Sequence, residues 1–201
     1  MITTELFDLS GKVALLTGAS KGMGQAMAEG LAEHGARVVI SCRKLDQCEA
    51  VADGLNERFG PETAQAIACN IGYKEQLQAL VDETRRRLGS IDVLVHNAGV
   101  NPFYGPMSEI PDEAFDKIMG SNVRSVHWIC QMVAPDMLEK GRGSIMVTAS
   151  TGAFHSSETL GTYSISKLAD IGLVRNLAAE WGPGGVRVNA ICPGLIKTDF
   201  A

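Results

Sequence analysis

Short apolar runs alternate with longer amphipathic stretches along the whole chain. In the short runs nearly every residue is apolar, a pattern typical of parallel strands that are covered on both faces of a sheet. Helical periodicity lies between them at 22–34, 44–59, 73–88, 112–139 (with a break near Gly120) and 161–181. This alternation predicts an α/β fold with right-handed crossovers and a doubly wound sheet. The predicted strands are Val13–Thr17, Arg37–Ser41, Thr63–Cys69, Ile91–His96, Ser144–Thr148 and Val186–Ile191.

Composition narrows the class of protein. The chain has 201 residues, of which 45% are hydrophobic, so we expect residues 1–201 to form a single domain around one core. A net charge of −5 argues against a nucleic-acid partner, because phosphate binding requires a basic surface. No apolar run reaches membrane-spanning length, so we expect no membrane association.

The cysteine pattern bears on the compartment. Five cysteines are present, an odd number with no Cys-x-x-Cys pair, and four lie in apolar strand or helix contexts. We therefore expect reduced thiols, no metal site and a reducing compartment, most simply the cytoplasm.

A glycine-rich turn follows the first predicted strand and opens a helix. It reads Thr17-Gly18-Ala19-Ser20-Lys21-Gly22-Met23-Gly24. Glycines let the backbone approach a ligand closely, and the helix N-terminus offers free N–H groups to a pyrophosphate. The context of strand, turn and helix favours a dinucleotide site over an ordinary glycine-rich loop.

The end of the second strand indicates which dinucleotide is bound. The sequence there is Ser41-Cys42-Arg43-Lys44, without the carboxylate that would bind the adenosine ribose of NAD. Arg43 can bind a 2′-phosphate through its planar guanidinium, and Lys21 can add a second charge. We expect NADP(H) to be preferred over NAD(H); the alternative is that Arg43 and Lys44 are solvated residues at a helix start.

Four polar side chains are candidates for the chemistry. Tyr163 and Lys167 are four residues apart, so they lie on one face of a helix, one turn apart. A nearby ammonium favours the phenolate and lowers the pKa of a tyrosine from about 10, which makes it a usable acid/base. Ser150 follows the fifth strand and can hold a substrate oxygen, although by itself it is an ordinary loop or cap serine. Asn122 is a further polar residue in an apolar helical stretch, where a cap or kink residue is the alternative.

In these motifs and their order the chain resembles the compact single-domain branch of the short-chain dehydrogenase/reductase family. The likeness spans essentially the whole chain and includes His96-Asn97-Ala98-Gly99, similar to the family's Asn-Asn-Ala-Gly, and Pro193-Gly194 with Thr198. It implies a Rossmann-type sheet of at least six strands in the order 3-2-1-4-5-6. It also implies a catalytic tetrad of Asn122, Ser150, Tyr163 and Lys167.

The same resemblance assigns roles at the cofactor. Lys167 would also bind the nicotinamide ribose, and Asn122 would hold a water in a proton relay. Together with the glycine turn and the strand ends, it yields the expected cofactor-binding set: Gly18, Ser20, Lys21, Gly22, Met23, Gly24, Arg43, Asn70, Ile71, Asn97, Ala98, Gly99, Tyr163, Lys167, Pro193, Gly194, Ile196 and Thr198.

The sequence departs from the family pattern in three places. His96 replaces the first asparagine of its motif and is more simply a structural group than a catalyst. Asn70 stands where an aspartate near the adenine is usual, and its amide oxygen can still bond the adenine amino group. The chain stops at Ala201, before the family's substrate-covering segment and last strand, so we expect a truncated chain with an exposed edge strand.

Substrate and assembly are less defined. Loops after the fourth and fifth strands supply the pocket candidates Asn101, Phe103, Ser150, Phe154 and His155, which fit anything from a sugar acid to a small hydrophobic ketone. The helices over 122–139 and 161–181 carry more apolar residues than packing on a sheet requires, which predicts a homodimer or homotetramer through them; deeper burial in one chain is the alternative.

The sequence therefore predicts an NADP(H)-dependent oxidoreductase that interconverts a ketone and a secondary alcohol. Two other classes remain open. One is a non-catalytic dinucleotide-binding sensor or scaffold of the same fold; the other is a methyltransferase or similar nucleotide-binding α/β domain, which leaves Tyr163, Lys167 and Ser150 as accidents.

Overall fold

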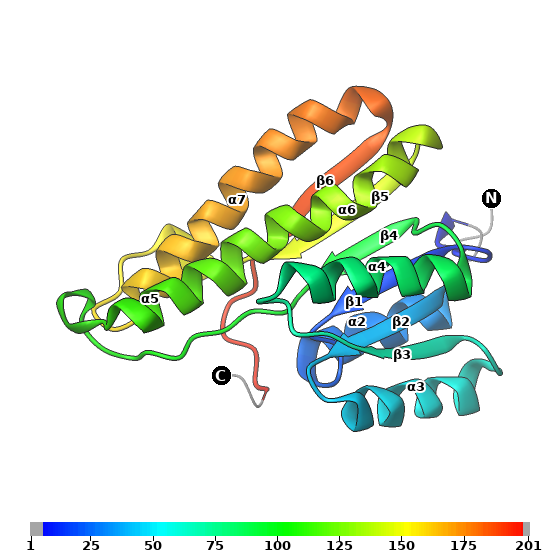
Figure 1. Ribbon diagram of the computed structural model, residues 1–201, viewed down its shortest axis with the longest axis horizontal. Coiled ribbons are helices and arrows are strands. Elements are labelled where there is room, and N and C mark those ends of the chain that lie inside the picture. Colours follow the sequence, from blue (N-terminus) through cyan, green and yellow to red (C-terminus); the bar gives the residue numbers. More distant parts are fainter. Residues whose placement is uncertain (1–5, 199–201) are drawn as a thin grey trace.

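Six parallel strands form the sheet of the computed structural model, which describes residues 6–198 (Figure 1). Their order is β3-β2-β1-β4-β5-β6, which confirms the predicted order 3-2-1-4-5-6. Each strand lies within one or two residues of its predicted limits. The strands are β1 (Val13–Thr17), β2 (Arg37–Cys42), β3 (Ala64–Ala68), β4 (Val93–His96), β5 (Gly143–Thr148) and β6 (Val186–Ile191).

Helices connect consecutive strands, as the alternation of apolar patterns predicts. Short 3-10 turns precede or follow several of them: η1 (Met107–Glu109), η3 (Thr151–Phe154) and η4 (Gly182–Gly184). The longer helices are α2 (Gly22–Glu33), α3 (Leu45–Phe59), α4 (Lys74–Leu88), α5 (Asp112–Met119), α6 (Ser125–Glu139) and α7 (Gly161–Trp181).

The strands bury apolar side chains on both faces, because successive residues of a strand point to opposite sides. Leu15 contributes to a core with α4, α6 and α7, whereas its neighbour Leu16 contributes to a second core with α2 and α3. Both leucines are fully buried. The two cores fix the sheet between two layers of helices.

The predicted break near Gly120 takes the form of a π-helical turn and does not end the helix. Gly120 has ordinary helical angles (φ −63°, ψ −47°), and the chain continues from α5 through a π-helical turn, η2 (Gly120–Arg124), into α6. A π-turn adds one residue to a helix without ending it, so the apolar periodicity slips while the hydrogen bonding continues. The slip in periodicity is what the sequence pattern registers as a break.

The cysteines also differ from the expectation of thiols throughout. Cys42, at the end of β2, and Cys48, in α3, are joined by a disulfide, while Cys69, Cys130 and Cys192 are free. Six residues separate the bonded pair. The sequence pattern gave no signal for the pair, because it has no Cys-x-x-Cys spacing.

The sheet reverses its winding between β1 and β4. These two strands are neighbours, pairing Thr17 with His96, although five other elements of structure (α2, β2, α3, β3 and α4) separate them in the chain. Ligands of such sheets bind beyond the carboxyl ends of the strands at this reversal. None of the helices in residues 6–198 combines the length and the apolar character needed to cross a bilayer.

Candidate active site

The glycine turn after β1 packs directly against the loop after β4. Asn97 donates a hydrogen bond from Nδ2 to the carbonyl oxygen of Gly18 (2.9 Å), and the Ala98 N–H donates to Oγ1 of Thr17 (3.3 Å). A Cβ atom on Gly18 would lie 2.8 Å from the Cα of Ala98, closer than real Cβ contacts. Glycine is therefore required here for the two loops to meet.

This turn suits a dinucleotide pyrophosphate. Gly18 and Gly22 have positive φ angles of 64° and 57°, which favour glycine. A Cβ on Gly24 would run into the Gly18 carbonyl and Nδ2 of Asn97. Because α2 begins at Gly22, its first N–H groups face the same end of the sheet as the turn. Ser20, Lys21 and Met23 complete the turn at its exposed or half-exposed side.

The end of β2 lies beside the glycine turn. The Ala19 N–H donates to the carbonyl oxygen of Ser41 (3.1 Å), and Thr17 is the register partner of Ser41. Arg43 follows one residue beyond β2 and is exposed. In residues 6–198 its guanidinium forms no ion pair. Arg43, the residue predicted to bind a 2′-phosphate, is therefore adjacent to the predicted pyrophosphate site.

The segment after β6 runs from the Ser150 loop to the glycine turn. Pro193 accepts hydrogen bonds at its carbonyl from the Thr151 N–H (2.9 Å) and from its Oγ1 (3.3 Å). Five residues later, Thr198 lies against Gly22, whose added Cβ would be 3.2 Å from the Thr198 methyl. Gly194 and Ile196, between them, are exposed. The segment therefore connects the Ser150 loop with the glycine turn.

Asn70 is engaged with its own loop. Its Oδ1 accepts the Gly72 N–H (3.1 Å), and its main-chain N–H donates to Oε1 of Gln76 (2.8 Å). The next residue, Ile71, is buried in the core. The amide oxygen expected to bond an adenine already holds one hydrogen bond, which leaves its second lone pair for a ligand.

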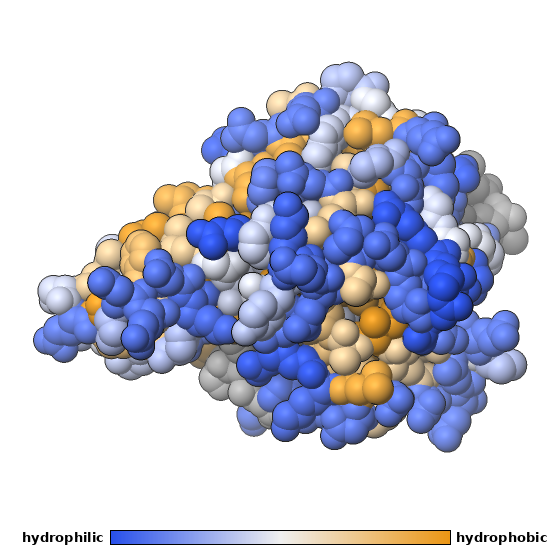
Figure 2. Space-filling view, viewed as in Figure 1, coloured by the Kyte–Doolittle hydropathy of each residue, from blue (hydrophilic) through white to orange (hydrophobic). Residues whose placement is uncertain are grey.

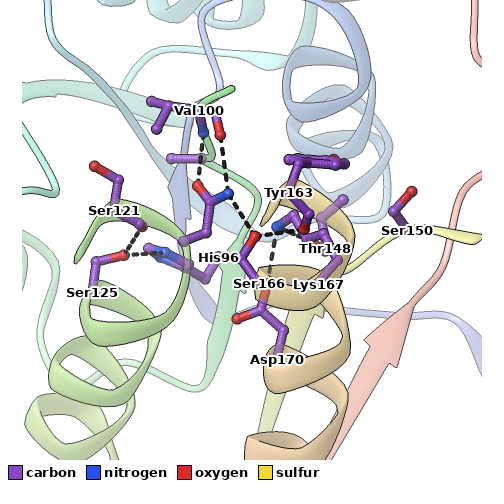
Figure 3. A network of polar contacts seen from close by, with 12 residues as sticks. His96, Val100, Ser121, Ser125, Thr148, Ser150, Tyr163, Ser166, Lys167 and Asp170 are labelled. Atoms are coloured by element: carbon purple, nitrogen blue, oxygen red, sulfur yellow. Dashed lines mark hydrogen bonds and ion pairs between the residues drawn. The ribbon is translucent and has the colours of Figure 1, made fainter. Parts of the chain in front are cut away.

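Tyr163 and Lys167 lie on one face of α7, with Lys167 turned towards the sheet. Figure 3 shows Tyr163, Lys167 and Asp170 on successive turns of this helix. The Lys167 Nζ lies 5.9 Å from the Tyr163 ring centroid and donates to the Thr148 carbonyl oxygen (2.8 Å) and to Oδ2 of Asp170 (3.0 Å). A Cβ on Gly99 would lie 3.5 Å from the same Nζ, so the ammonium reaches the loop that contacts the glycine turn.

The pKa of Tyr163 is raised from its ordinary value, not lowered as the sequence predicts. Burial is the largest cause, and the carboxylate of Asp170 adds to it, whereas hydrogen bonding with Ser150 acts in the opposite direction. The expectation considered positive charges near the phenol and not its burial. It is wrong because burial of the phenol is the largest effect, and the Asp170 carboxylate, which the motif does not include, raises the pKa further.

Asn122 ties the loop after β4 to α7. Its Oδ1 accepts the Val100 N–H (2.8 Å), and its Nδ2 donates to the Val100 carbonyl (3.0 Å) and to Oγ of Ser166 (3.0 Å). Asn122 is fully buried. Both of its amide hydrogens are used, so any water in the predicted relay would have to bind to an acceptor of this residue.

His96 is a structural residue with both ring nitrogens bonded. Nδ1 lies 3.0 Å from Oγ1 of Thr17, and Nε2 lies 3.1 Å from Oγ of Ser125 (Figure 3). Burial lowers the pKa of His96 to about 3, helped by the Lys167 charge. The ring is therefore neutral near pH 7, in agreement with its interpretation as a structural group.

A protein-family model described as short chain dehydrogenase matches residues 12–201. The chain belongs to this family. Among curated proteins, dehydrogenase/reductase SDR family member 4 of Mus musculus is 40% identical over 194 residues, covering 96% of this chain and 68% of the relative. The human protein of the same name is 38% identical over 196 residues, covering 96% of this chain and 69% of its own length.

Solved structures of other short-chain dehydrogenases have the same fold. A 7α-hydroxysteroid dehydrogenase, complexed with NADH and 7-oxo glycochenodeoxycholic acid, superimposes with a TM-score of 0.93 at 36% identity, covering 99% of this chain and 76% of that one. Levodione reductase superimposes with a TM-score of 0.90 at 31% identity, covering 95% and 74%. As a member of the family, the protein is an NAD(P)-linked oxidoreductase that acts on CH–OH groups.

The substrate-pocket candidates of this short-chain dehydrogenase come from two loops that meet beside α7. The Gly105 N–H donates to the Thr159 carbonyl (3.0 Å), and Gly161 contacts the side chain of Met107. Phe103 is half-buried and packs against Gly105. Asn101 has a buried Oδ1 without a hydrogen-bond partner in residues 6–198. Phe154 and His155 are exposed.

Asp170, Thr148 and Ser166 take part in the site but were not predicted from the sequence. Asp170 occurs three residues after Lys167 in an apolar helical stretch, where the spacing could have suggested an ion pair. Thr148 contributes only its main-chain carbonyl, which no side-chain motif records. Residues 6–198 hold no group of three His, Cys, Asp or Glu residues arranged to bind a metal.

Proposed function

We propose that this short-chain dehydrogenase is an NADP(H)-dependent enzyme that interconverts a ketone and a secondary alcohol, with Tyr163 as its acid/base. The observation that carries the proposal is a convergence in space. Lys167, one turn from Tyr163, reaches the carboxyl end of β5 and the Gly99 loop, and that loop packs on the glycine turn at Gly18. The Tyr163 phenol, the Lys167 ammonium and the glycine turn proposed to bind the dinucleotide therefore lie at the same end of the sheet.

Tyr163 handles the proton in both directions. The nicotinamide of a dinucleotide bound at the glycine turn would supply or accept the hydride. When a carbonyl is reduced, negative charge develops on its oxygen, and the Tyr163 phenol donates a proton to it. When an alcohol is oxidised, the phenolate takes that proton back.

Ser150 orients the substrate oxygen. It is the N-cap of the 3-10 turn η3, where its Oγ accepts the Gly152 N–H (3.1 Å). That bond uses a lone pair of Oγ, so the hydroxyl can still donate, either to the neighbouring Tyr163 phenol or to a substrate oxygen. A donor held in place near the phenol stabilises the developing oxyanion.

Lys167 is oriented before any ligand binds. Two of its three ammonium hydrogens are directed to Thr148 and Asp170, which leaves the third for a ribose hydroxyl. Asn122 supports this arrangement indirectly, because it holds the Val100 loop against Ser166 on the same helix as Lys167.

The preference for NADP(H) rests on the junction of β2 and α3. Arg43 is exposed one residue after β2, and Ser41 and Cys42 supply no carboxylate to repel a 2′-phosphate. An arginine in this place can form a bidentate, charge-assisted pair with phosphate. NAD(H) would lose that pair and would bind more weakly.

The substrate is a carbonyl compound or alcohol that is small enough to lie between the two pocket loops. Phe103 and Phe154 offer apolar surface, while Asn101 and His155 offer hydrogen bonds. The oxo bile acid in the 7α-hydroxysteroid dehydrogenase structure makes cyclic ketones a rational first panel.

The decisive experiment combines a substrate screen with one substitution. NADPH oxidation is followed against cyclic ketones, aliphatic ketones and keto sugars. Tyr163→Phe should then lower turnover on the best substrate by about 10²–10⁴-fold, the usual contribution of a general acid, while the dissociation constant for NADPH changes little.

The control is Tyr73→Phe, at a tyrosine that is exposed at the start of α4; it should keep full turnover. Tight NADPH binding without turnover on any substrate would favour the alternative, a non-catalytic sensor or scaffold. Wild-type rates in Tyr163→Phe would remove Tyr163 from its role.

We also propose that residues 1–201 act as one dinucleotide-binding and catalytic domain that assembles as a homodimer or homotetramer. Supporting this, Figure 2 shows a hydrophobic band along the side of the molecule where Figure 1 places α7. Ile165 and Leu168 of that helix are 44% and 51% exposed, and Leu138 of α6 is 37% exposed. Contact between copies would bury them.

A cytoplasmic location is our proposal for the compartment. The free thiols Cys69 and Cys130, both buried, support it, whereas the Cys42–Cys48 disulfide counts against it. A count of reactive thiols in the denatured protein, isolated under thiol-blocking conditions, distinguishes five thiols from three.

A further inference from the structure

Asp170 is a buried carboxylate in contact with Lys167, and no motif in the sequence includes it. It lies in α7, one turn after Lys167, where the two side chains share a face of the helix. The side chains of Lys167 and Asp170 are 5% and 0% exposed, and Nζ lies 3.0 Å from Oδ2 (Figure 3). Burying a charge pair this completely costs desolvation free energy, so its presence requires an explanation.

The pair is poorly compensated for a purely structural element. Lys167 has a second acceptor in the Thr148 carbonyl, but the other carboxylate oxygen of Asp170, Oδ1, is buried without a hydrogen-bond partner in residues 6–198. A buried ion pair with an unsatisfied oxygen is often less stabilising than apolar residues in the same space. Stability alone is therefore a weak explanation for Asp170.

The titratable groups that face this pair come from three elements. On α7 they include Tyr163, on α6 Cys130 and on β4 His96. Burial, with the charge of Asp170, raises the pKa of Cys130 to about 12, and burial, with the charge of Lys167, lowers that of His96 to about 3. Both are neutral near pH 7, so Lys167 and Asp170 set the charge next to the phenol.

The two charges of the pair act on Tyr163 in opposite directions. An ammonium stabilises the phenolate, whereas a carboxylate stabilises the protonated phenol. With the carboxylate ionised, the pair has no net charge, and the ammonium is drawn along α7 towards Asp170.

We propose that Asp170 is a positioning residue, which holds the Lys167 ammonium against the end of β5 and offsets its charge so that Tyr163 rests in its protonated, proton-donating form. The proposal rests on the proposed function for its chemical meaning. Reduction of a carbonyl begins from the phenol and oxidation of an alcohol from the phenolate. Asp170 therefore widens the pH range in which the enzyme is ready to reduce.

The direct test measures the phenol itself and needs no turnover. The protein contains three tyrosines, so ¹³Cζ-tyrosine NMR resolves few signals, and Tyr163→Phe assigns the one of interest. Asp170→Asn keeps the shape and removes the charge. The pKa of Tyr163 should fall by about one unit, because the Lys167 ammonium, whose Nζ lies 5.9 Å from the ring centroid, is then no longer offset by a carboxylate.

Asp136→Asn is the matched control. Asp136 is also a partly buried, ion-paired carboxylate, bound to Arg85 between α4 and α6, and its removal should leave the Tyr163 pKa unchanged. Asp170→Leu carries the same expectation as Asp170→Asn and substitutes an apolar residue of similar size. An unchanged Tyr163 pKa in either variant, or failure of both to fold, would make Asp170 a structural residue and overturn the proposal.

The kinetic test applies once a substrate is known. In Asp170→Asn the acidic limb of kcat for alcohol oxidation should move to lower pH by a similar shift, whereas KM for the cofactor should change less than kcat. Absence of turnover in the wild type would refute the proposed function. The NMR titration would still decide the effect of Asp170 on Tyr163, so the two failures are distinguishable.

Discussion

At His96 the hydrogen bonds define the tautomer as well as the position of the ring. The Ser125 hydroxyl donates to the Ser121 carbonyl (2.5 Å), so at Oγ it can only accept from Nε2–H. Nδ1 must then accept the hydroxyl proton of Thr17, whose oxygen in turn accepts the Ala98 N–H. One buried ring thus joins β1, β4 and the start of α6 through bonds that require it to be neutral.

This requirement predicts a pH-dependent stability. The folded-state pKa of His96, about 3, lies below the ordinary value of 6.5. The contribution of the neutral His96 ring to the free energy of unfolding is therefore complete above pH 6.5. It is lost as the pH falls towards 3, because the unfolded chain binds the proton first. From pH 7 to pH 5 the free energy of unfolding should fall by about 2 kcal/mol from this residue alone.

His96→Asn should remove that dependence, and urea unfolding at both pH values measures it. His127→Asn, at an exposed histidine of α6, should retain the wild-type difference. Equal pH dependence in wild type and His96→Asn would show that the ring does not titrate as described.

Individual residues of the site were predictable where a motif records a side chain. Such a motif includes Tyr163, Lys167, Ser150 and Asn122. In the structure Lys167 lies one turn from Tyr163 on α7, and Asn122 contacts that helix through Ser166. Asp170 was not predictable in this way, because an aspartate in a helix is usually solvated and its burial depends on the packing of α7 against the sheet. The predicted direction of the Tyr163 pKa shift was wrong because burial of the phenol, the largest cause, also depends on packing that the motif does not record.

At the scale of elements, the π-turn η2 places Asn122 and Ser125 where they act. An extra residue in a helix rotates everything after it relative to an uninterrupted α-helix, so residues before and after the turn can face the core at an altered spacing. Ser121, Asn122 and Ser125 are all buried. Periodicity predicted the strands and the other helices well, because their apolar spacing is constant. Near Gly120, where the spacing changes, it indicated an interruption but not that the helix continues through a π-turn.

The junction of β2 and α3 carries the prediction for the cofactor. Arg43→Ala should weaken NADPH binding about 10–100-fold, the loss of one charge-assisted bidentate contact, and should leave NADH binding nearly unchanged. Isothermal titration with both cofactors measures the ratio. Arg142→Ala, beyond the opposite ends of the strands at the start of β5, is the control; a parallel loss of both cofactors in Arg43→Ala would contradict the assignment.

At the scale of the whole molecule, the exposed apolar band on α7 predicts self-association. Leu168→Glu would place a charge in the contact between copies, and burial of an unpaired charge is costly. We expect the wild type to be a dimer or tetramer and Leu168→Glu to shift to monomer in size-exclusion chromatography with light scattering. Leu45→Glu, a similarly exposed leucine on α3, should keep the wild-type mass; a monomeric wild type at micromolar concentration would refute the contact.

The reversal of the sheet between β1 and β4 separates the residues proposed for the two ends of the dinucleotide. The strands on one side of it carry the glycine turn and Arg43, which we propose to bind the phosphates and adenosine of a dinucleotide, and those on the other side carry Ser150 and the helix of Tyr163. In this proposal neither half holds the whole dinucleotide by itself. A dinucleotide bound across the junction of β1 and β4 would contact both halves of the sheet. Residues that recognise its phosphate end and residues that act at its nicotinamide end could then change independently, while the pairing of β1 with β4 stays the same.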